Sequence, residues 1–461
     1  MKVEKYNEIL NELKSIITGT EWENHIFTVG GCNRDFLMGN PIKDIDLVVD
    51  LPSGGIKFAK WLHKNKYSSK PVTYENFGTA MFHLEKFPDI ELEVVQTRSE
   101  CYHDAKTRNP ETSFGTLKED WQRRDFTINA IYYNISNDDF IDFENRGKND
   151  IENKIIRTCG DPNIIFDEDP LRIFRMVRFA ARFKNFKIED ETYQCAKNFR
   201  DRLSIISRER ITDEFTKMMK HSYYSITKSL SLMWDLELFK WIIPEFENIS
   251  TYDRYCILNN ITKMGSYIGL SNTTVLTKLM YEAIQIYREK YPDAKFSNND
   301  LVKYYLRDCL IFSNDVINKI TLLINENEKL EKVIYEKEDY LENMESLIRR
   351  VMNECGDSDT FCLACGIGDG TVADYFLERD YDGNTVFEEY DEYQKKFYTY
   401  KLPVTGEDVM EIFGIGPGKK VKEVLTKTLN FVFVNPSKSS KEDCIDFVKY
   451  LKQLDDEWGK Y

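Results

Sequence analysis

The hydrophobic pattern of this 461-residue chain changes about a third of the way along. In the first part, short β-branched and aromatic runs alternate with helical stretches. Strands are predicted at 25–29, 45–49, 80–84, 90–95 and 131–133, and helices at 1–18 and 56–66. From Asp169 onward, apolar residues recur with the helical period and strand signals almost vanish. The pattern therefore predicts an α/β or α+β domain followed by an all-helical remainder.

Length and composition limit the class of protein. A single hydrophobic core stops growing near about 250–300 residues, so a chain of 461 residues requires several domains. No stretch approaches the ~18 apolar residues of a membrane span, and the N-terminal helix lacks the apolar centre of a signal peptide. Ten scattered cysteines in such a chain favour reduced thiols. We therefore predict a cytoplasmic protein that makes no contact with a membrane.

The charge distribution bears on possible partners. A net charge of −15 argues at first sight against binding of nucleic acid. However, residues 151–220 carry more basic than acidic side chains, whereas the parts on either side are acidic. The net charge alone therefore does not exclude a polyanionic partner.

A glycine turn and two aspartates stand close together in the first predicted domain. Gly30 and Gly31 lie between a strand and a helix start, so backbone N–H groups can approach a phosphate, and Arg34 adds a charged donor. Asp44 and Asp46 are two residues apart on the next strand and project from one face. Two such carboxylates are costly unless a divalent cation such as Mg²⁺ lies between them. The alternative is an edge strand with a solvated acidic face.

A further acidic strand extends this pattern. Glu91 and Glu93 alternate onto one face of the strand 90–95, and Arg98 follows it. A carboxylate on a neighbouring strand would complete a two-metal site of the kind that catalyses phosphoryl transfer. Either glutamate is equally compatible with a position facing solvent.

Two arginine-rich segments follow. In the first, Arg123 and Arg124 beside Asp125 and Asn129 suit the triphosphate and ribose of a nucleotide. The alternative is an arginine pair at the start of a surface helix.

The second segment follows Asp169. Arg172, Arg175, Arg178 and Arg182 recur at helical spacing and form one stripe. Such a stripe either binds an anion or is a solvated helix face.

These elements, in this order and spacing, resemble the class II tRNA nucleotidyltransferase and bacterial poly(A) polymerase family. The resemblance covers about residues 27–183. It rests on GGxxRD at 30–35, Asp44-x-Asp46, Glu93 in EVVQTR, RRDFTINA at 123–130 and EDPLRIFRMVRF at 168–179, with a weaker similarity at 402–425.

The resemblance implies an α+β fold with four parts. An N-terminal nucleotidyltransferase palm, a mixed β-sheet with helices, would occupy 1–150. It would be followed by a helical neck (151–235) carrying the helix that selects the base, a helical body (236–345), and a helical, tRNA-binding tail (346–461).

The resemblance also implies a role for each motif residue. Asp44 and Asp46 would hold two Mg²⁺ ions, with Glu93 as the third catalytic carboxylate. The nucleotide would be bound by Gly30, Gly31, Arg34, Arg124 and Asn129, while Asp169 and Arg172 select the base and Arg175 and Arg178 orient that pair and neutralise phosphate.

The implied activity is addition of C, C and A to the 3′ end of tRNA, without a nucleic-acid template, from CTP and ATP. Poly(A) polymerases and enzymes that add only CC or only A are the alternatives within the family. The acidic C-terminal half favours tRNA over poly(A) synthesis, and the full-length loop 99–119 favours completion with A. We expect this loop to control the switch from C to A addition. A catalytically silent RNA-binding protein and a small-molecule nucleotidyltransferase are alternatives of other classes.

A glycine-rich turn near the C-terminus is a candidate RNA contact. Gly414, Gly416 and Gly418 precede Lys419 and Lys420, so bare N–H groups and two cations stand together. The alternative is a glycine-capped helix hairpin with solvated lysines.

Overall fold

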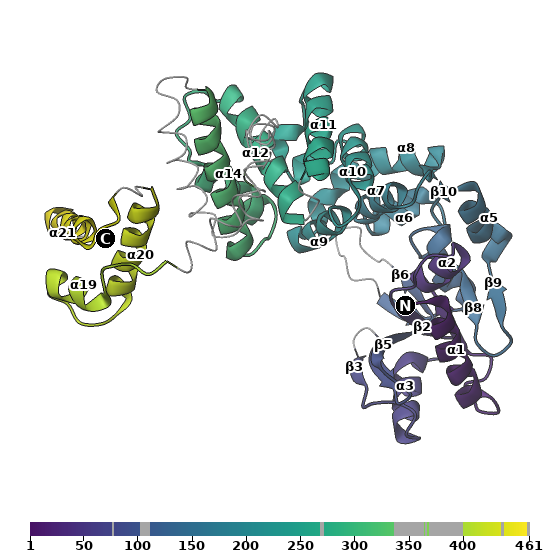
Figure 1. The fold of residues 1–461 in the computed structure, drawn as a ribbon. Coiled ribbons are helices and arrows are strands. Elements are labelled where there is room, and N and C mark those ends of the chain that lie inside the picture. The colour runs from purple at the N-terminus through teal and green to yellow at the C-terminus, as the bar shows by residue number, and fades with distance from the viewer. Residues whose placement is uncertain are drawn as a thin grey trace, which may run out of the picture. The chain divides into compact units, whose positions relative to one another are not determined.

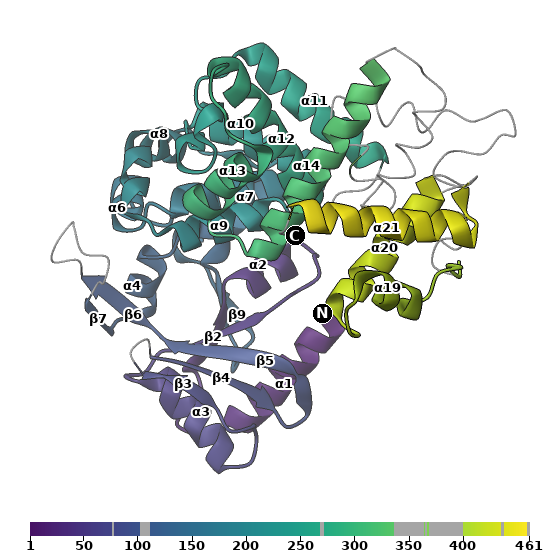
Figure 2. The same cartoon turned by 90° about the vertical axis from the view of Figure 1, so that its left-hand side faces the viewer.

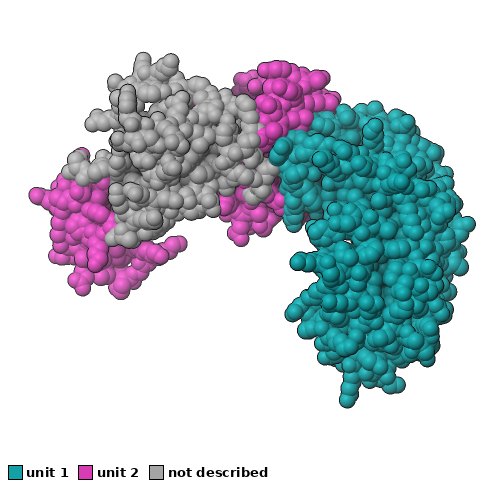
Figure 3. Space-filling model, turned by 45° about the vertical axis from the view of Figure 1, so that its right-hand side comes forward, with its two compact units in different colours: residues 1–241 teal, residues 242–461 magenta. Residues whose placement is uncertain are grey.

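The structure of the chain is a computed structural model. It describes residues 1–75, 78–101, 111–267, 272–335, 364, 367, 400–434 and 438–458. The chain divides into two compact units, unit 1 (residues 1–241) and unit 2 (residues 242–461), which Figure 3 shows in different colours. None of the described helices combines the length and the apolar character that crossing a membrane requires.

Unit 1 is built on a seven-stranded sheet with the order β3-β4-β5-β2-β1-β8-β9. Its strands are β1 (Ile26–Val29), β2 (Ile45–Val49), β3 (Val72–Tyr74), β4 (Thr79–Leu84), β5 (Phe87–Gln96), β8 (Tyr132–Asn134) and β9 (Asp139–Ile141). β2 and β5 run parallel, whereas the other neighbouring strands are antiparallel. The sheet is therefore mixed, and its central parallel pair lies between two antiparallel flanks (Figure 2).

Helices surround this sheet and continue beyond it. They are α1 (Val3–Ile17), α2 (Gly31–Leu37), α3 (Gly54–Lys64), α4 (Leu117–Gln122), α5 (Arg146–Asn153), α6 (Pro162–Glu168), α7 (Arg172–Arg182), α8 (Asp190–Phe199), α9 (Arg208–Met218) and α10 (Tyr223–Asp235). A separate hairpin of β6 (Arg98–Cys101) and β7 (Glu111–Phe114) precedes α4, and β10 (Ile155–Ile156) pairs with β11 (Lys187–Ile188). Figures 1 and 2 place α6–α10 at the opposite end of unit 1 from α3.

The strand period sorts side chains onto the two faces of the sheet. Leu47 of β2 and Val94 of β5 are buried in one cluster with Ile9 of α1 and Phe58 of α3. Val48 points the other way and belongs to a second cluster. The face covered by α1 and α3 therefore forms the main core. The alternate residues of β2 and β5 point to the opposite face.

Unit 2 is helical throughout its described residues. It comprises α11 (Thr251–Tyr267), α12 (Asn272–Lys290), α13 (Asn298–Lys303), a π-helical turn (Tyr304–Cys309), α14 (Asn314–Tyr335), α19 (Gly406–Phe413), α20 (Lys419–Val434) and α21 (Lys441–Trp458). The last three helices share small apolar clusters, in which Val409, Val424 and Val448 are buried.

The change of hydrophobic period predicted the architecture. All five predicted strands lie on β1, β2, β4, β5 and β8, and the predicted α+β class is confirmed. The edge strands β3 and β9 were not predicted, because short, largely solvated strands such as Val72–Tyr74 lack apolar alternation. The proposed divisions at 150, 235 and 345 stay predictions.

The alternative interpretation of Arg123 and Arg124, a pair at the start of a surface helix, is wrong. Arg123 and Arg124 do not begin a helix: Arg123 is the C-cap of α4, and a 3₁₀ turn at Thr127–Asn129 follows. Residues 102–110 of the loop 99–119 lie outside the described residues, whereas its two ends form the β6–β7 hairpin.

Candidate active site

Two carboxylates meet on the central parallel strands. In the register of β2 and β5, Asp46 lies directly opposite Glu93, and both alternate with buried apolar residues. Asp44 precedes β2 and is exposed. Burial and the negative charge of Glu93 raise the pKa of Asp46 to about 6, and Asp44 adds to the effect. The structure therefore sets Asp46 and Glu93 side by side, and Asp44 lies two residues before Asp46 along the chain. Glu91 lies two residues before Glu93 on β5 and is opposite His83 of β4.

The glycine turn closes against this acidic group. Gly30 has a φ of +87°, and a Cβ added there would lie 3.2 Å from Oδ2 of Asp46. A side chain at this position would therefore be strained and would press on the carboxylate. Gly31 begins α2, and a Cβ there would lie 3.4 Å from Nη2 of Arg34. Bare backbone thus lies beside the carboxylates, as the sequence predicted.

Arg34 is buried in a network rather than projecting into solvent. Its Nε and Nη2 donate to the two oxygens of Asp35, each at 2.9 Å, and Nη1 donates to Oδ1 of Asn129 at 2.5 Å. Its guanidinium also lies over the rings of Phe179 and Phe183. Arg34 therefore connects α2 with the 3₁₀ turn and with α7, and its contact with a triphosphate stays a prediction.

Arg124 is positioned by a residue to which the sequence analysis assigned no role. The carboxylate of Asp120 is fully buried and accepts hydrogen bonds from Arg123, from Arg124 and from the hydroxyl of Tyr132. Burial alone would raise the pKa of Asp120, but the charges of Arg124 and Arg123 hold it well below its usual range. Arg124 in turn lowers the pKa of Asp46, so it acts on the acidic group. In the sequence, this contact could have been predicted from the i, i+4 spacing of Asp120 and Arg124.

The arginine stripe of α7 is not a solvated helix face. Arg175 donates to Oδ2 of Asp125 at 2.9 Å through Nε and at 2.6 Å through Nη2. Arg178 is buried, and its Nε donates to Oε2 of Glu214 on α9 at 2.7 Å. These pairs attach α7 to the segment after α4 and to α9.

The two residues expected to select the base have separate partners. Arg172 is buried and donates to the carbonyl oxygens of Ile165, at 2.9 Å, and Arg123, at 2.6 Å. Asp169 caps the end of α6 and accepts from Arg210 of α9, with 2.8 Å between its Oδ2 and Nη2 of Arg210. Their side chains therefore stand at the start of α7 without bonding to each other.

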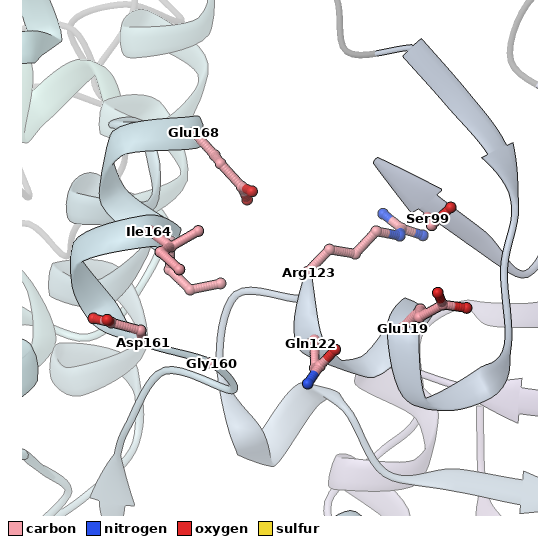
Figure 4. A pocket seen from close by; sticks show the side chains of 9 residues that line it. Ser99, Glu119, Gln122, Arg123, Gly160, Asp161, Ile164 and Glu168 are labelled. Atoms are coloured by element: carbon pink, nitrogen blue, oxygen red, sulfur yellow. The ribbon is translucent and has the colours of Figure 1, made fainter. Parts of the chain in front are cut away.

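A pocket of about 390 Å³ lies beside this region (Figure 4). Glu168 of α6 projects into it from one side, while Arg123 extends across it toward Ser99 of the β6–β7 hairpin. Asp46, Glu93 and Arg34 do not line it. The pocket therefore separates α6 from the hairpin and is distinct from the acidic group.

The predicted lysine contacts in unit 2 differ in their surroundings. Lys419 is exposed, whereas Nζ of Lys420 donates to Oδ1 of Asp455 at 2.6 Å. That hydrogen bond raises the pKa of Lys420. Gly414 adopts a φ of +67° at the C-cap of α19, which is the glycine cap that the alternative interpretation requires. An RNA contact at these lysines stays a prediction.

The acidic group suits a hard divalent cation. Within the described part of the chain, no three or more His, Cys, Asp or Glu side chains form a group that could hold a metal ion. Mg²⁺ is ordinarily held by one or two carboxylates, with water and substrate phosphates completing its shell. Burial and the negative charge of Glu93 both disfavour ionised Asp46, and a divalent cation would offset both effects, so the residues present fit such an ion.

Two family models match separate segments of this chain. Residues 26–157 match the family model described as the poly A polymerase head domain, and residues 185–249 match the model described as a probable RNA and SrmB-binding site of polymerase A. The tRNA nucleotidyltransferase cca1 of Schizosaccharomyces pombe is 26% identical over 95% of this chain and 93% of its own length.

A second relative and a solved structure agree with these matches. The CCA-adding enzyme of Pediococcus pentosaceus is 32% identical over 63% of this chain and 68% of its own length. The structure of the Bacillus stearothermophilus CCA-adding enzyme in complex with CTP has the same fold, with a TM-score of 0.65, 19% identity, and coverage of 99% of this chain and 100% of that one. This chain belongs to the class II CCA-adding enzyme and poly(A) polymerase family.

Proposed function

We propose that this chain adds C, C and A to the 3′ end of tRNA from CTP and ATP and releases pyrophosphate at each step. The observation that carries the proposal is the register that sets Asp46 opposite Glu93, with Asp44 beside them and the bare Gly30–Gly31 turn against Asp46. The names of the relatives support it, since they are a tRNA nucleotidyltransferase and a CCA-adding enzyme.

The acidic group is proposed to hold the catalytic metal. Nucleotidyltransferases of this family generally use a divalent ion; its identity as Mg²⁺ and the number of two ions are our proposal. Asp44 and Asp46 would be the ligands and Glu93 the third carboxylate. Such ions, when bound, lower the pKa of the primer 3′-hydroxyl and stabilise the leaving pyrophosphate.

The positive groups around the carboxylates are proposed to bind the triphosphate. Gly30 and Gly31 offer backbone that a phosphate can approach closely, and Arg124 is held near Asp46 by Asp120. Arg34 would act from the buried network that it forms with Asn129. Because these groups are held by the protein before substrate arrives, little reorganisation is needed when charge develops on the phosphates.

Asp169 and Arg172 are proposed to select the base, with Arg175 and Arg178 holding their helix in place. Cytosine and adenine share an exocyclic amino group, which can donate a hydrogen bond to the carboxylate of Asp169. Beside it, both bases have a ring nitrogen that can accept a hydrogen bond from Arg172. Uracil and guanine present a carbonyl oxygen where the amino group would be. A carbonyl facing a carboxylate leaves unpaired acceptors that cost about 1–3 kcal/mol each. The site thus discriminates through hydrogen bonding rather than size.

The proposal is tested with tRNAs that end before, within and after CCA, offered CTP and ATP separately and together. Addition of CC from CTP alone, of one further A when ATP is supplied, and no extension beyond CCA are expected. Repeated AMP addition would instead indicate a poly(A) polymerase. CTP addition without completion would indicate a CC-adding enzyme, and absence of any addition would favour an RNA-binding protein. A cytoplasmic location stays a prediction.

Asp46→Asn is expected to lower nucleotide addition at least about a hundredfold, because one metal-holding carboxylate is lost. The same variant should raise the melting temperature of the metal-free protein at pH 8. The folded-state pKa of Asp46, about 6, lies above its ordinary value, so ionised Asp46 destabilises the folded state above pH 6. This gain should disappear as the pH falls toward 4. Asp89→Asn, an exposed change on the neighbouring strand β5, is the control, and an Asp46→Asn enzyme within tenfold of the parent would refute the assignment.

Asp120→Asn should raise the KM for CTP roughly tenfold while changing the KM for tRNA little. Neutral asparagine leaves the charges of Arg123 and Arg124 without their buried partner, so the triphosphate contact of Arg124 is misplaced. Tyr132→Phe removes a neighbouring hydrogen bond but keeps the Asp120 charge, and it should have a much smaller effect. Steady-state kinetics with each substrate varied in turn would measure this; equal increases in both KM values would indicate a general structural role.

Asp169→Ala should relax the choice of base more than it weakens triphosphate binding. With the carboxylate gone, UTP is no longer repelled, and its incorporation relative to CTP should rise about tenfold or more. Arg210→Gln is the matched variant, because it keeps Asp169 but removes its partner. Incorporation of all four nucleotides would be measured in competition. Unchanged discrimination in Asp169→Ala would move base selection to other residues.

A further inference from the structure

A buried side-chain amide spans the glycine turn from inside the protein. Asn33 lies on α2, shortly after Gly31, and is 1% exposed. Its Nδ2 donates to the carbonyl oxygen of Thr28 on β1 at 2.8 Å, and its Oδ1 accepts from the hydroxyl of Thr28 at 2.7 Å. Two hydrogen bonds therefore connect the ends of the segment 29–32, which contains Gly30 and Gly31.

The same amide has two further partners. Oδ1 of Asn33 accepts from the hydroxyl of Tyr6 on α1 at 3.0 Å, and Nδ2 donates to the carbonyl oxygen of Ile131, just before β8, at 2.8 Å. An asparagine side chain offers two N–H donors and two acceptor lone pairs, so all four are in use. Tyr6, Thr28 and Ile131 are also buried, so these bonds are shielded from solvent. Asn33, Tyr6 and Thr28 are called the amide network below.

The turn that the amide network spans lies directly against a proposed catalytic carboxylate. A Cβ added to Gly30 would lie 3.2 Å from Oδ2 of Asp46. The thiol of Cys32 adds a contact across the turn, because it donates to the carbonyl oxygen of Val29 at 3.2 Å. A buried network in which every polar group is satisfied specifies one arrangement of the groups that it joins. The network therefore fixes the direction of the backbone N–H groups of the turn relative to Asp46.

We propose that Asn33, fixed by Tyr6 and Thr28, is a positioning residue for the triphosphate at the glycine turn. The inference rests on the proposed function, which assigns the phosphates to this turn. Because Asn33 is buried, it acts through the backbone of the segment 29–32. A phosphate bound by backbone N–H groups depends on their direction, since hydrogen bonds weaken steeply away from linear geometry. The other explanation is a network that only stabilises the fold.

Two substitutions at Thr28 separate the role of its hydroxyl from that of its methyl group. Thr28→Val keeps the side-chain volume but removes the donor to Oδ1 of Asn33, whereas Thr28→Ser keeps the donor and removes the methyl group. Thr28→Val should raise the Kd for CTP, measured with Mg²⁺ and without tRNA, about fivefold, because the amide loses one partner. Thr28→Ser should retain most of the affinity. The reverse order would assign the effect to packing and overturn the proposal.

Asn33→Leu removes all four hydrogen bonds of the amide. It should raise the Kd values for CTP, ATP and inorganic tripolyphosphate by the same factor, about tenfold or more. Equal factors are expected because the turn contacts phosphates, and tripolyphosphate has no base. Tyr6→Phe removes a single hydroxyl and should have a smaller effect in the same direction. A loss of affinity confined to the two nucleotides would place the effect at the base and contradict the proposal.

A destabilised control separates positioning from general stability. Phe58→Leu on α3 shortens a fully buried side chain of the same apolar cluster that contains Tyr6. It should lower the melting temperature at least as much as Thr28→Val, yet leave the Kd for tripolyphosphate unchanged. Equal weakening in both variants would reduce the network to a structural role and overturn the proposal, and the Thr28 pair decides the matter even if Asn33→Leu does not fold. Failure of the parent protein to add CMP to tRNA, although it binds CTP, would instead refute the proposed function.

Discussion

The ion pair between Asp125 and Arg175 joins the two halves of the site. Burial would raise the pKa of Asp125, but the charge and hydrogen bonds of Arg175, supported by Asn129 and the amide of Phe126, hold it at about 2. The pair connects the segment after α4, which carries Arg124, with α7, which begins at Arg172. Asn129 extends the connection to Arg34. Arg34 beside the glycine turn, the segment that carries Arg124, and the helix proposed to select the base are therefore held in one framework.

This framework explains how a protein with a net negative charge can bind two negatively charged substrates, tRNA and a nucleoside triphosphate. The chain carries a net charge of −15, yet four arginines follow one another along α7, and Arg34 lies beside the glycine turn. Several of them are held by buried acids: Asp120 holds Arg124, and Glu214 holds Arg178. A buried acid fixes the direction of a guanidinium while leaving its remaining donors for a substrate. The site therefore depends on the orientation of a few arginine side chains rather than on the overall charge of the protein.

Periodicity predicted the sheet and the acidic group, because both depend on local sequence. Alternation along 45–49 and 90–95 placed Asp46 and Glu93 each on one defined face of its strand, and the resemblance to a known family supplied their roles. The register that sets them opposite each other was visible only in the structure. The acidic partners of the arginines lie far from them in the chain, so periodicity could not predict these pairs either. The α7 arginines were compatible with a solvated face until Asp125 and Glu214 were found to hold them.

A double-mutant cycle on Asp125 and Arg175 tests most directly whether the segment after α4 and the helix proposed to select the base act as one unit. We predict that Asp125→Asn and Arg175→Gln each lower kcat/KM for CTP, with tRNA lacking CCA as primer, by about tenfold or more. Because both changes break the same connection, kcat/KM of the double variant should be no lower than that of the less active single variant. Effects that multiply in the double variant would show that the two residues act independently, and would contradict the account.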